Sequence, residues 1–328
     1  ALRQKYLGDY EPRRRTSASK NSTEFLCAPK CFCLNAIHNS KNTMITIDGK
    51  QIANTIRADL KEKIKQLPSP PGLGVILVGN DPASHLYVAL KEAASKEMGV
   101  RFVKKIFPET ISQADLLHTI RELNVDDSIH AILIQLPLPR GFDEDETIAA
   151  IDPAKDVDGF HPQNISALLN GYHNFIKPVL AQSIWALINE GLVLQNRMSV
   201  HETLHALLIG NSTVFTIPVA TYLKSKGIKT DAVLARALSK PLLKQYDIII
   251  VACGQPGIIG SADVARNTVI IDIGTNKLQD GRVVGDTDFA SFAHTECAIT
   301  PVPGGIGPVT VAMLMKNTVD LARRAMKI

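Results

Sequence analysis

The chain has 328 residues, of which 45% are hydrophobic and 21% charged, and its net charge is +4. This length exceeds one ordinary core of roughly 100–150 residues, so we expect two domains. No apolar run reaches the roughly 18–20 residues of a membrane helix. Beyond residue 43 the charge is near neutral, so neither a membrane nor a nucleic-acid partner is expected.

Residues 1–43 differ from the rest of the chain. They carry eight Lys/Arg against three acids, are rich in Ser and Asn, and lack hydrophobic periodicity. Arg and Ser are typical of an organellar transit peptide, although the acids and the cysteines fit that poorly. A disordered tail, or upstream sequence translated from a misplaced start, is the favoured interpretation. We exclude the segment from the fold and expect a cytoplasmic protein, or an organellar one if the segment is a transit peptide.

The chain has five cysteines, too few for a disulfide framework at this length. Cys27, Cys31 and Cys33 lie in the N-terminal segment, but no matching Cys/His pair follows at zinc-site spacing, so we expect no metal. Cys253 and Cys297 lie among apolar residues and are expected to pack as small hydrophobes.

Helices and strands alternate from Met44 onward. In the first half we predict four helices and three apolar strands, in this order: helix Gln51–Gln66, strand Leu73–Val78, a helix opened by Asp81-Pro82 and closed by Gly99, strand Phe102–Phe107, helix Ser112–Leu123, strand His130–Leu136 and helix Glu144–Ile151. This alternation predicts a parallel sheet covered on both faces.

The second half continues the alternation. We predict helix Val179–Asn189, strand His205–Ile209, helix Pro218–Lys226, strands Asp231–Leu234, Asp247–Val251 and Thr268–Ile273, and a last helix Pro308–Met326. The expected fold is therefore α/β with two domains. Residues 44–177 form the first, to which helix 308–328 returns, and residues 178–307 form a Rossmann-like second domain.

Ser84, Tyr87 and Lys91 lie at i, i+3 and i+7 and so share one helix face. A phenol and an amine one turn apart can act on the same substrate. An amine held among apolar groups would lose proton affinity and become a usable acid or base. From spacing alone, a solvated lysine beside a half-buried tyrosine remains the favoured interpretation.

Three further motifs follow. QLPLP (residues 135–139) places one polar side chain at the end of an apolar strand, where α/β proteins bind ligands. KDVDGFHP (155–162) carries two acids in a turn that its glycine allows. TPVPGGIGP (300–308) is a stiff loop with bare backbone, suited to lying against a ring. Each motif alone is more often a turn.

Together and in this order, the four motifs resemble the bifunctional methylenetetrahydrofolate dehydrogenase/methenyltetrahydrofolate cyclohydrolases, from about Met44 to Arg324. The resemblance implies an N-terminal catalytic domain, a C-terminal NAD(P) domain, a folate cleft between them and a homodimer. It implies oxidation of 5,10-methylenetetrahydrofolate and hydrolysis of the methenyl product to 10-formyltetrahydrofolate, in one-carbon metabolism and purine biosynthesis.

The resemblance also implies residue roles. Lys91 matches the catalytic lysine, Tyr87 the tyrosine that stacks on or orients the folate ring, Gln135 the glutamine that tunes the lysine, and Asp158 the aspartate that binds the pterin. A neutral Gln135 can hold Lys91 without raising its pKa, as a carboxylate would. The other implied substrate contacts are Ser84, Pro301, Gly304 and Gly305.

The nucleotide loop departs from the family pattern GRSxxVGxP. Gly210, Ser212 and Pro218 remain, but Asn211 replaces the arginine and Thr216 the second glycine. Asn211 removes a cation near the phosphates. Thr216 adds a branched Cβ where a glycine lets the backbone approach a pyrophosphate.

Other nucleotide-side motifs are mixed. Ala235 replaces the serine of HSxT that would bind a 2′-phosphate, while Arg236 beside it could meet that phosphate. No Asp or Glu that could bind the ribose of NAD follows the strand ending at Leu234, so NADP is favoured over NAD. An arginine that simply faces solvent is nearly as good an interpretation of Arg236. The hinge at 177–182 lacks the cysteine and threonine of PCTPxG. DIGTN (272–276) and GDTDF (285–289) match closely. The candidate cofactor residues are Gly210, Asn211, Ser212, Arg236 and Thr275.

Three functions therefore compete: the bifunctional enzyme, a cyclohydrolase whose nucleotide site is degenerate, and a non-catalytic folate-binding or partner-binding protein. Intact Lys91, Gln135 and Asp158 argue against the third. The hydrolytic step needs no nucleotide, so the second is the nearest alternative to the bifunctional enzyme.

Because residues 1–43 lack core-forming periodicity, we expect their deletion to leave the melting temperature and the activity nearly unchanged. Thermal unfolding of the full and shortened chains measures this directly. A clear loss of folded protein on deletion would contradict the interpretation.

Overall fold

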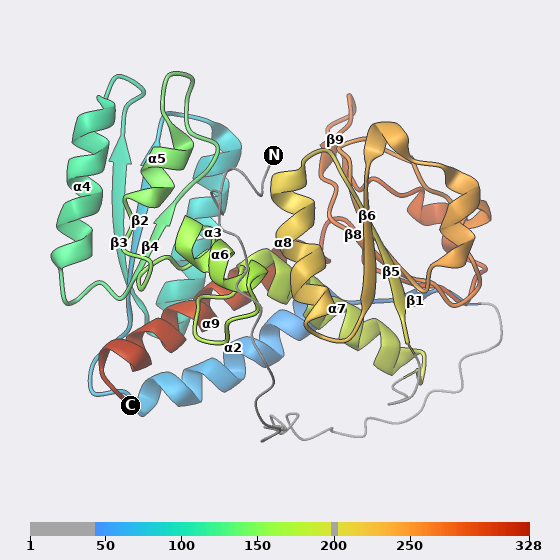
Figure 1. The fold of residues 1–328 in the computed structure, drawn as a ribbon, viewed down its shortest axis with the longest axis horizontal. Helices are drawn as coiled ribbons and strands as arrows, with labels where there is room; N and C mark the ends of the chain where they lie inside the picture. Colours follow the sequence, from blue (N-terminus) through green and yellow to red (C-terminus); the bar gives the residue numbers. More distant parts are fainter. Residues whose placement is uncertain (1–42, 198–202) are drawn as a thin grey trace, which may run out of the picture.

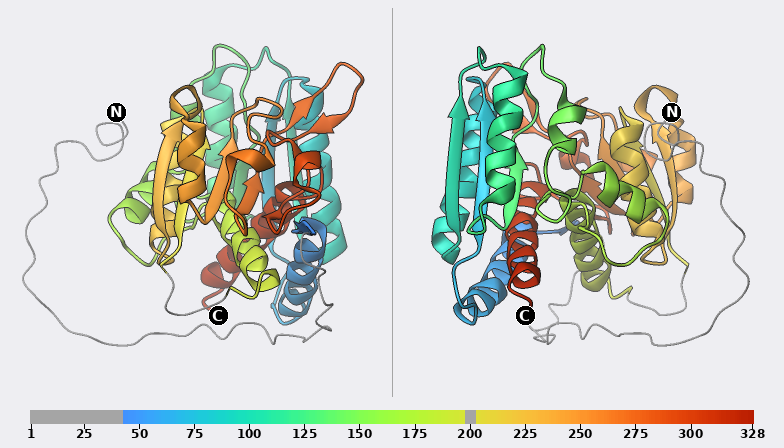
Figure 2. Two further views of the ribbon diagram at one scale, coloured as in Figure 1. Left: turned by 90° about the vertical axis from the view of Figure 1, so that its right-hand side faces the viewer. Right: turned by 60° about the vertical axis from the view of Figure 1, so that its left-hand side comes forward.

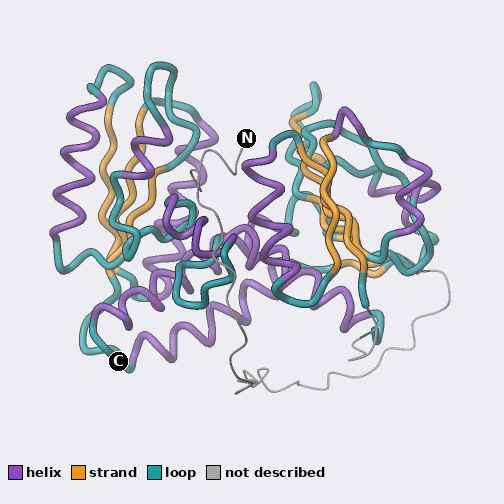
Figure 3. The backbone as a smooth tube through the Cα atoms, in the orientation of Figure 1, coloured by secondary structure: helices purple, strands orange, loops and turns teal. Residues whose placement is uncertain are grey.

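The computed structural model describes residues 43–197 and 203–328. The expectations for the N-terminal segment, including its three cysteines, concern residues outside these ranges. The described chain forms two lobes, each built on its own parallel β-sheet (Figure 1). The two sheets stand apart as separate groups of strands, with helices between and around them (Figure 3). The two-domain α/β architecture expected from the sequence is confirmed.

The first lobe has a three-stranded sheet in the order β3-β2-β4, with all strands parallel. Its strands are β2 (Gly72–Val78), β3 (Arg101–Phe107) and β4 (Ala131–Ile134). Its helices are α3 (Pro82–Met98), α4 (Gln113–Val125), α5 (Glu144–Ala149) and α6 (Pro162–Leu169).

Strand β2 is buried on both faces, as its unbroken apolar sequence predicts. Leu73, Val75 and Leu77 belong to the core that α3 and two further helices cover, while Ile76 and Val78 belong to the core beneath α4. This alternation is the period of two that a strand imposes on its side chains. The sheet is thereby clamped between two helical layers.

The second lobe has a six-stranded parallel sheet in the order β1-β11-β8-β7-β5-β6. Its strands are β1 (Ile45–Thr46), β5 (His205–Gly210), β6 (Lys229–Leu234), β7 (Ile248–Ala252), β8 (Val269–Asp272) and β11 (Ala298–Ile299). A short antiparallel pair, β9 (Asn276–Lys277) and β10 (Val283–Val284), lies beside it. Helix α8 (Thr213–Lys224) and the 3₁₀ helices η1 (Ala235–Ala237), η2 (Lys240–Gln245), η3 (Ser261–Asp263) and η4 (Phe289–Phe292) complete the lobe.

Three long helices join the lobes: α2 (Gly49–Lys65), α7 (Val179–Leu194) and α9 (Ile306–Ala325). They run beneath both sheets, and α2 lies alongside α9 (Figures 1 and 2). Apolar residues of α9 share the core of the first lobe, and those of α7 share the core of the second. Strand β1 pairs with β11 in the second sheet, although residues 45–46 were expected in the first domain. The chain therefore crosses between the lobes more than once.

Several element boundaries differ from the prediction. Helix α8 begins at Thr213, not at Pro218, because Ser212 caps it by accepting a hydrogen bond from the Val214 backbone N–H. The proline lies inside the helix. Helix α7 extends to Leu194, five residues beyond the predicted end. Helix α6 and the two-residue strands β1 and β11 were not predicted, because periodicity cannot identify such short elements.

Cys253 and Cys297 are buried in an apolar cluster under the second sheet, which confirms their predicted packing. Burial raises the pKa of both thiols, that of Cys253 to about 11. Within the two described ranges, no helix combines the length and the apolar character needed to cross a membrane.

The start of α2 packs directly against the loop that precedes α9. A Cβ on Gly49 would lie 1.8 Å from the Gly305 carbonyl oxygen, whereas a Cβ on Gly307 would meet nothing within 4 Å. We expect Gly49→Ala to lower the free energy of unfolding by about 1–3 kcal/mol through overpacking. We expect Gly307→Ala, the matched control, to leave it unchanged or raise it by roughly 0.5–1 kcal/mol. Urea unfolding of both variants tests this, and equal stabilities would contradict the close approach.

Candidate active site

The polar centre of the first lobe is a lysine bonded to a neutral amide. Lys91 projects from α3, which Asp81 caps and Gly99 ends, as the sequence predicts. Its Nζ donates to Gln135 Oε1 at 2.6 Å, and Gln135 Nε2 donates to the Leu136 carbonyl at 2.7 Å. Burial lowers the pKa of the Lys91 ammonium, and the charge of Asp158 opposes this. The lysine thus has the lowered proton affinity that acid–base chemistry near neutral pH requires.

Asp158 lies in a turn that a second aspartate organises. The Asp156 carboxylate accepts hydrogen bonds from the backbone N–H groups of Gly159 (3.2 Å) and His161 (2.7 Å) and from Asn164 Nδ2 (2.9 Å). Gly159 has a φ of 75°, and a Cβ there would lie 2.7 Å from the Pro178 nitrogen. The turn therefore requires glycine for both its conformation and its close packing.

Asp158 is half-buried. Burial raises the pKa of its carboxyl to about 6, the Lys91 charge opposes the shift, and the Asp156 charge adds to it. The two groups affect each other's titration, so Lys91, Gln135 and Asp158 form one electrostatic unit. The structure brings together these three residues, which lie far apart in the sequence.

The two other candidate residues on this face of α3 differ in their exposure to solvent. Tyr87 is 44% exposed, one turn from Lys91, and is free to contact a ligand. Ser84 is only 3% exposed, and its backbone N–H donates to the Asp81 cap at 2.8 Å. Ser84 therefore serves the start of the helix, and its contact with a substrate stays a prediction.

The loop at 300–305 connects the second sheet to α9. Thr300 Oγ1 accepts a hydrogen bond from the Asp272 backbone N–H at 2.8 Å. Gly304 has a φ of 112°, and Gly305 lies against Pro301 and the start of α2. The loop is thus pinned at both ends, which fixes the backbone that Pro301, Gly304 and Gly305 would present to a ring.

The nucleotide-side candidates gather at one edge of the second sheet. The chain leaves β5 toward β6 on one side and returns to β7 on the other, so a crevice is expected at the C-terminal ends of β5 and β7. Asn211, Ser212, Arg236 and Thr275 are exposed there, after β5, β6 and β8. The N-terminus of α8 also opens onto this edge and favours an anion.

The side chains of the two altered loop residues, Asn211 and Thr216, make contacts within the second lobe. Asn211 Nδ2 donates to the Cys253 carbonyl at 2.6 Å and so joins the loops after β5 and β7. Thr216 is 3% exposed, and its methyl group would lie 3.0 Å from a Cβ on Gly210. Thr216 therefore affects the spacing of α8 and β5 and does not protrude into the crevice. The edge fits a phosphorylated dinucleotide, through Arg236 and the α8 terminus, but with one cation fewer than the family pattern.

DIGTN and GDTDF have a structural explanation. Asp286 is fully buried and accepts from the backbone N–H groups of Cys253, Gly254 and Gln255, so it shapes the loop after β7. Asp272 accepts from the backbone N–H and the hydroxyl of Thr287. These carboxylates hold the loops in place and face the protein interior.

Two family models match this chain. One describes a tetrahydrofolate dehydrogenase/cyclohydrolase catalytic domain and matches residues 47–158. The other describes the NAD(P)-binding domain of the same enzymes and matches residues 181–326. The bifunctional protein FolD of Nautilia profundicola is 39% identical over 290 residues, which is 87% of this chain and 99% of that protein. This chain belongs to the tetrahydrofolate dehydrogenase/cyclohydrolase family.

Further family members agree in sequence and fold. FolD of Geobacillus thermodenitrificans is 39% identical over 85% of this chain and 97% of that protein. The bifunctional enzyme FolD from Campylobacter jejuni has a solved structure that matches with a TM-score of 0.79 and 38% identity, over 86% of this chain and 99% of that one. The Trypanosoma brucei FolD complexed with NADP cofactor and inhibitor matches with a TM-score of 0.77 and 30% identity, over 87% and 99%.

Sequence reasoning missed the residues of this family member that support Asp158. Asn164 Oδ1 accepts from the Ile176 N–H at 3.1 Å, and Asn317 Nδ2 donates to the Val157 carbonyl at 2.8 Å. Asn317 lies 160 residues from Val157, so no local pattern could identify the contact. The first acid of KDVDG was visible in the sequence, but its task of organising the turn was not.

The neutral amide at Gln135 leads to a pH prediction. In Gln135→Glu a carboxylate would replace the amide bonded to Lys91, raise the pKa of the ammonium and reduce the neutral amine at a given pH. We expect the pH profile of the hydrolytic rate to move to higher pH by about one unit or more. Gln66→Glu, at the exposed C-terminal end of α2, is the matched control and should leave the profile unmoved. An unshifted profile in Gln135→Glu would show that this bond does not control Lys91.

Proposed function

We propose that this protein oxidises 5,10-methylenetetrahydrofolate to the methenyl form with NADP and hydrolyses that product to 10-formyltetrahydrofolate. The observation that carries the proposal is the 2.6 Å hydrogen bond from Lys91 to Gln135, beside Asp158. A half-buried amine held by a neutral partner, next to a half-buried carboxylate, suits proton transfer on a bound heterocycle. Family membership supports the same activities.

In the hydrolytic step, water adds to the electrophilic methenyl carbon and must lose a proton. The lowered pKa of Lys91 increases the fraction of neutral amine that can accept it. The Asp158 carboxylate can accept paired hydrogen bonds from the 2-amino group and a ring N–H of the pterin, which would fix the substrate beside the amine. Tyr87, on the same face as Lys91, would contact the ring.

In the oxidative step, NADP supplies the hydride acceptor. Arg236 after β6 would hold its 2′-phosphate, and Ser212 at the α8 terminus would lie by the pyrophosphate. Gly210 and Thr275 would complete the contacts. Hydride transfer requires the folate and the dinucleotide in one cleft, which supports a site between the two lobes.

A cyclohydrolase without effective dehydrogenase activity is the second candidate. Asn211 in place of arginine favours this second candidate, because the Asn211 side chain carries no charge and donates its hydrogen bond to the Cys253 carbonyl. Assays of both half-reactions on the purified protein, with NAD and NADP in parallel, separate the candidates. Hydrolysis without oxidation would select the second. Neither reaction, with folate still bound, would select a non-catalytic folate-binding protein.

The family resemblance also supports a cytoplasmic homodimer that serves purine biosynthesis. Light scattering on the purified protein measures the oligomeric state, and a monomer across the micromolar range would contradict the dimer.

If Lys91 accepts the proton in hydrolysis, Lys91→Met should abolish that step while the affinity for folate stays within about tenfold of the parent. The matched control is Lys96→Met, which removes an exposed lysine from the same helix. Hydrolysis is followed by loss of the methenyl absorbance, and binding by calorimetry. Near-normal hydrolysis in Lys91→Met would refute the assignment.

Restoring the family loop should strengthen cofactor binding. We expect Asn211→Arg with Thr216→Gly to tighten NADP binding, because a charge-assisted contact contributes about 1.5–3 kcal/mol. Glycine inside α8 costs about 1 kcal/mol of stability, so Asn211→Arg alone is measured in parallel.

Ser225→Arg adds the same charge at the other end of α8 and should leave NADP affinity nearly unchanged. Titration of NADP into the parent and the three variants gives the result. Micromolar binding by the parent, unimproved in the double variant, would mean that the loop holds the phosphates in another way.

A further inference from the structure

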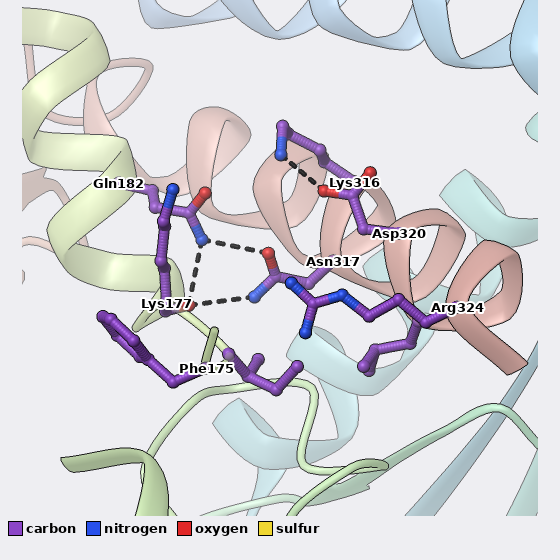
Figure 4. A pocket seen from close by; sticks show the side chains of 9 residues that line it. Phe175, Lys177, Gln182, Lys316, Asn317, Asp320 and Arg324 are labelled. Atoms are coloured by element: carbon purple, nitrogen blue, oxygen red, sulfur yellow. Dashed lines mark hydrogen bonds and ion pairs between the residues drawn. The ribbon is translucent and has the colours of Figure 1, made fainter. Parts of the chain in front are cut away.

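A hollow lies where the chain crosses between the lobes, between the start of α7 and the second half of α9. We call it the junction pocket. It is lined by polar and charged residues on one side, namely Lys177, Gln182, Lys316, Asn317, Asp320 and Arg324. Phe175 adds an apolar side chain next to Lys177 (Figure 4). The free volume is about 60 Å³, enough for a few water molecules or one small tetrahedral ion.

The junction pocket is distinct from the folate-side centre. Lys91, Gln135 and Asp158 do not line it. Lys316 and Arg324 lie well along α9, roughly 15 Å or more from the loop that precedes this helix, at a rise of about 1.5 Å per residue. The pocket lies behind the turn that carries Asp158, and Asn317 separates the two through its bond to the Val157 carbonyl.

Its lining carries an excess of positive charge. Three cations, Lys177, Lys316 and Arg324, face a single carboxylate, Asp320, which accepts a hydrogen bond from Lys316 at 2.6 Å. Although Lys177 keeps exposed surface, burial lowers the pKa of its ammonium, and the charges of Lys226 and Lys316 lower it further. Neighbouring cations repel one another, and a bound anion offsets that repulsion.

The polar groups are also held in place. Gln182 Nε2 donates to the Lys177 carbonyl (2.9 Å) and to Asn317 Oδ1 (3.0 Å), and Asn317 Nδ2 donates to the same carbonyl (3.0 Å). Figure 4 shows Arg324 extending from α9 toward this network. Arg324 is exposed, and a guanidinium at the open side of a pocket with a rigid polar floor suits bidentate recognition of an oxyanion.

We propose that the junction pocket binds one small divalent oxyanion of the phosphate type, held by Arg324, Lys177 and Lys316. Three cations and one carboxylate leave two positive charges, which match such an ion in number. The ligand is free inorganic phosphate or the phosphate group of a small metabolite. Binding there would join the crossover segment to α9, two elements that support the Asp158 turn. The proposal does not depend on either catalytic step.

The chain offers a local reporter. Trp185 is its single tryptophan and lies one turn after Gln182 on α7, with Lys226 Nζ 6.0 Å from its ring centroid. Potassium phosphate is titrated into the full chain at constant ionic strength, with potassium chloride as the blank, and tryptophan fluorescence and calorimetry are recorded. We expect saturable binding of one ion per chain, also in the presence of saturating NADP, because an ion at the nucleotide edge would be displaced.

Variants distinguish the pocket from general surface attraction. Arg324→Gln should weaken phosphate binding by about tenfold, as for loss of one charged hydrogen bond. Asp320→Asn should strengthen it, since it removes the only carboxylate of the lining and breaks only a partly exposed ion pair. Arg323→Gln is the matched control: it removes an exposed arginine next in sequence that does not line the pocket, and its affinity should stay within about twofold.

Sulfate and glucose 6-phosphate are titrated in parallel to identify the source of the anion. Tighter binding of the ester supports a phosphorylated metabolite, and tighter binding of the inorganic ions supports free phosphate. Thermal unfolding without ligand confirms that each variant is folded. A response that does not saturate, complete displacement by NADP, or equal loss in Arg324→Gln and Arg323→Gln would overturn the proposal.

Discussion

The buried carboxylate of Asp156 is the constraint on which the first lobe and its site depend. Burial raises the pKa of this group, while the hydrogen bonds from His161 and Asn164 oppose the shift. Those donors leave little of the charge unsatisfied, so the turn is costly to deform. The backbone at Asp156 also forms a β-bridge with Ile132 of β4, the strand that ends one residue before Gln135. The side chain of Asp156 thus fixes the turn that carries Asp158, and the backbone bridge places this turn beside the strand that leads to the partner of Lys91.

The second lobe uses the same physical device at its own functional edge. Asp286 gathers consecutive backbone N–H groups after β7, and Asp272 holds the segment that contains Asp286 itself. Backbone donors in a loop cannot pair within a strand or helix, so a buried carboxylate satisfies several at once. The loops that would receive a dinucleotide are consequently rigid before any ligand arrives. This preorganisation remains even though Asn211 and Thr216 depart from the family pattern.

The two lobes thus differ in how closely their candidate site residues match the family pattern. On the folate side Lys91, Gln135 and Asp158 are all present. Burial shifts the pKa of both Lys91 and Asp158, and the charge of each residue opposes the shift of the other. On the nucleotide side the loops are held by buried carboxylates, and Arg236 and the start of α8 are the proposed contacts for the phosphates. If hydrolysis uses only the first set of residues and oxidation needs both, as proposed, changes in the nucleotide loop will affect the two reactions unequally.

The alternation of helices and strands, the parallel sheets and the family could all be predicted from the amino-acid sequence. These follow from local patterns, such as the apolar run of β2 and the Asp81 and Gly99 signals that bound α3. Family motifs also selected Lys91, Gln135 and Asp158. The sequence did not predict that Ser84 is buried at the start of α3, that Thr216 packs toward β5 or that Asn317 supports Val157; the folded chain shows all three. These contacts join residues far apart in the chain or depend on which way a side chain turns, and neither is encoded in local periodicity.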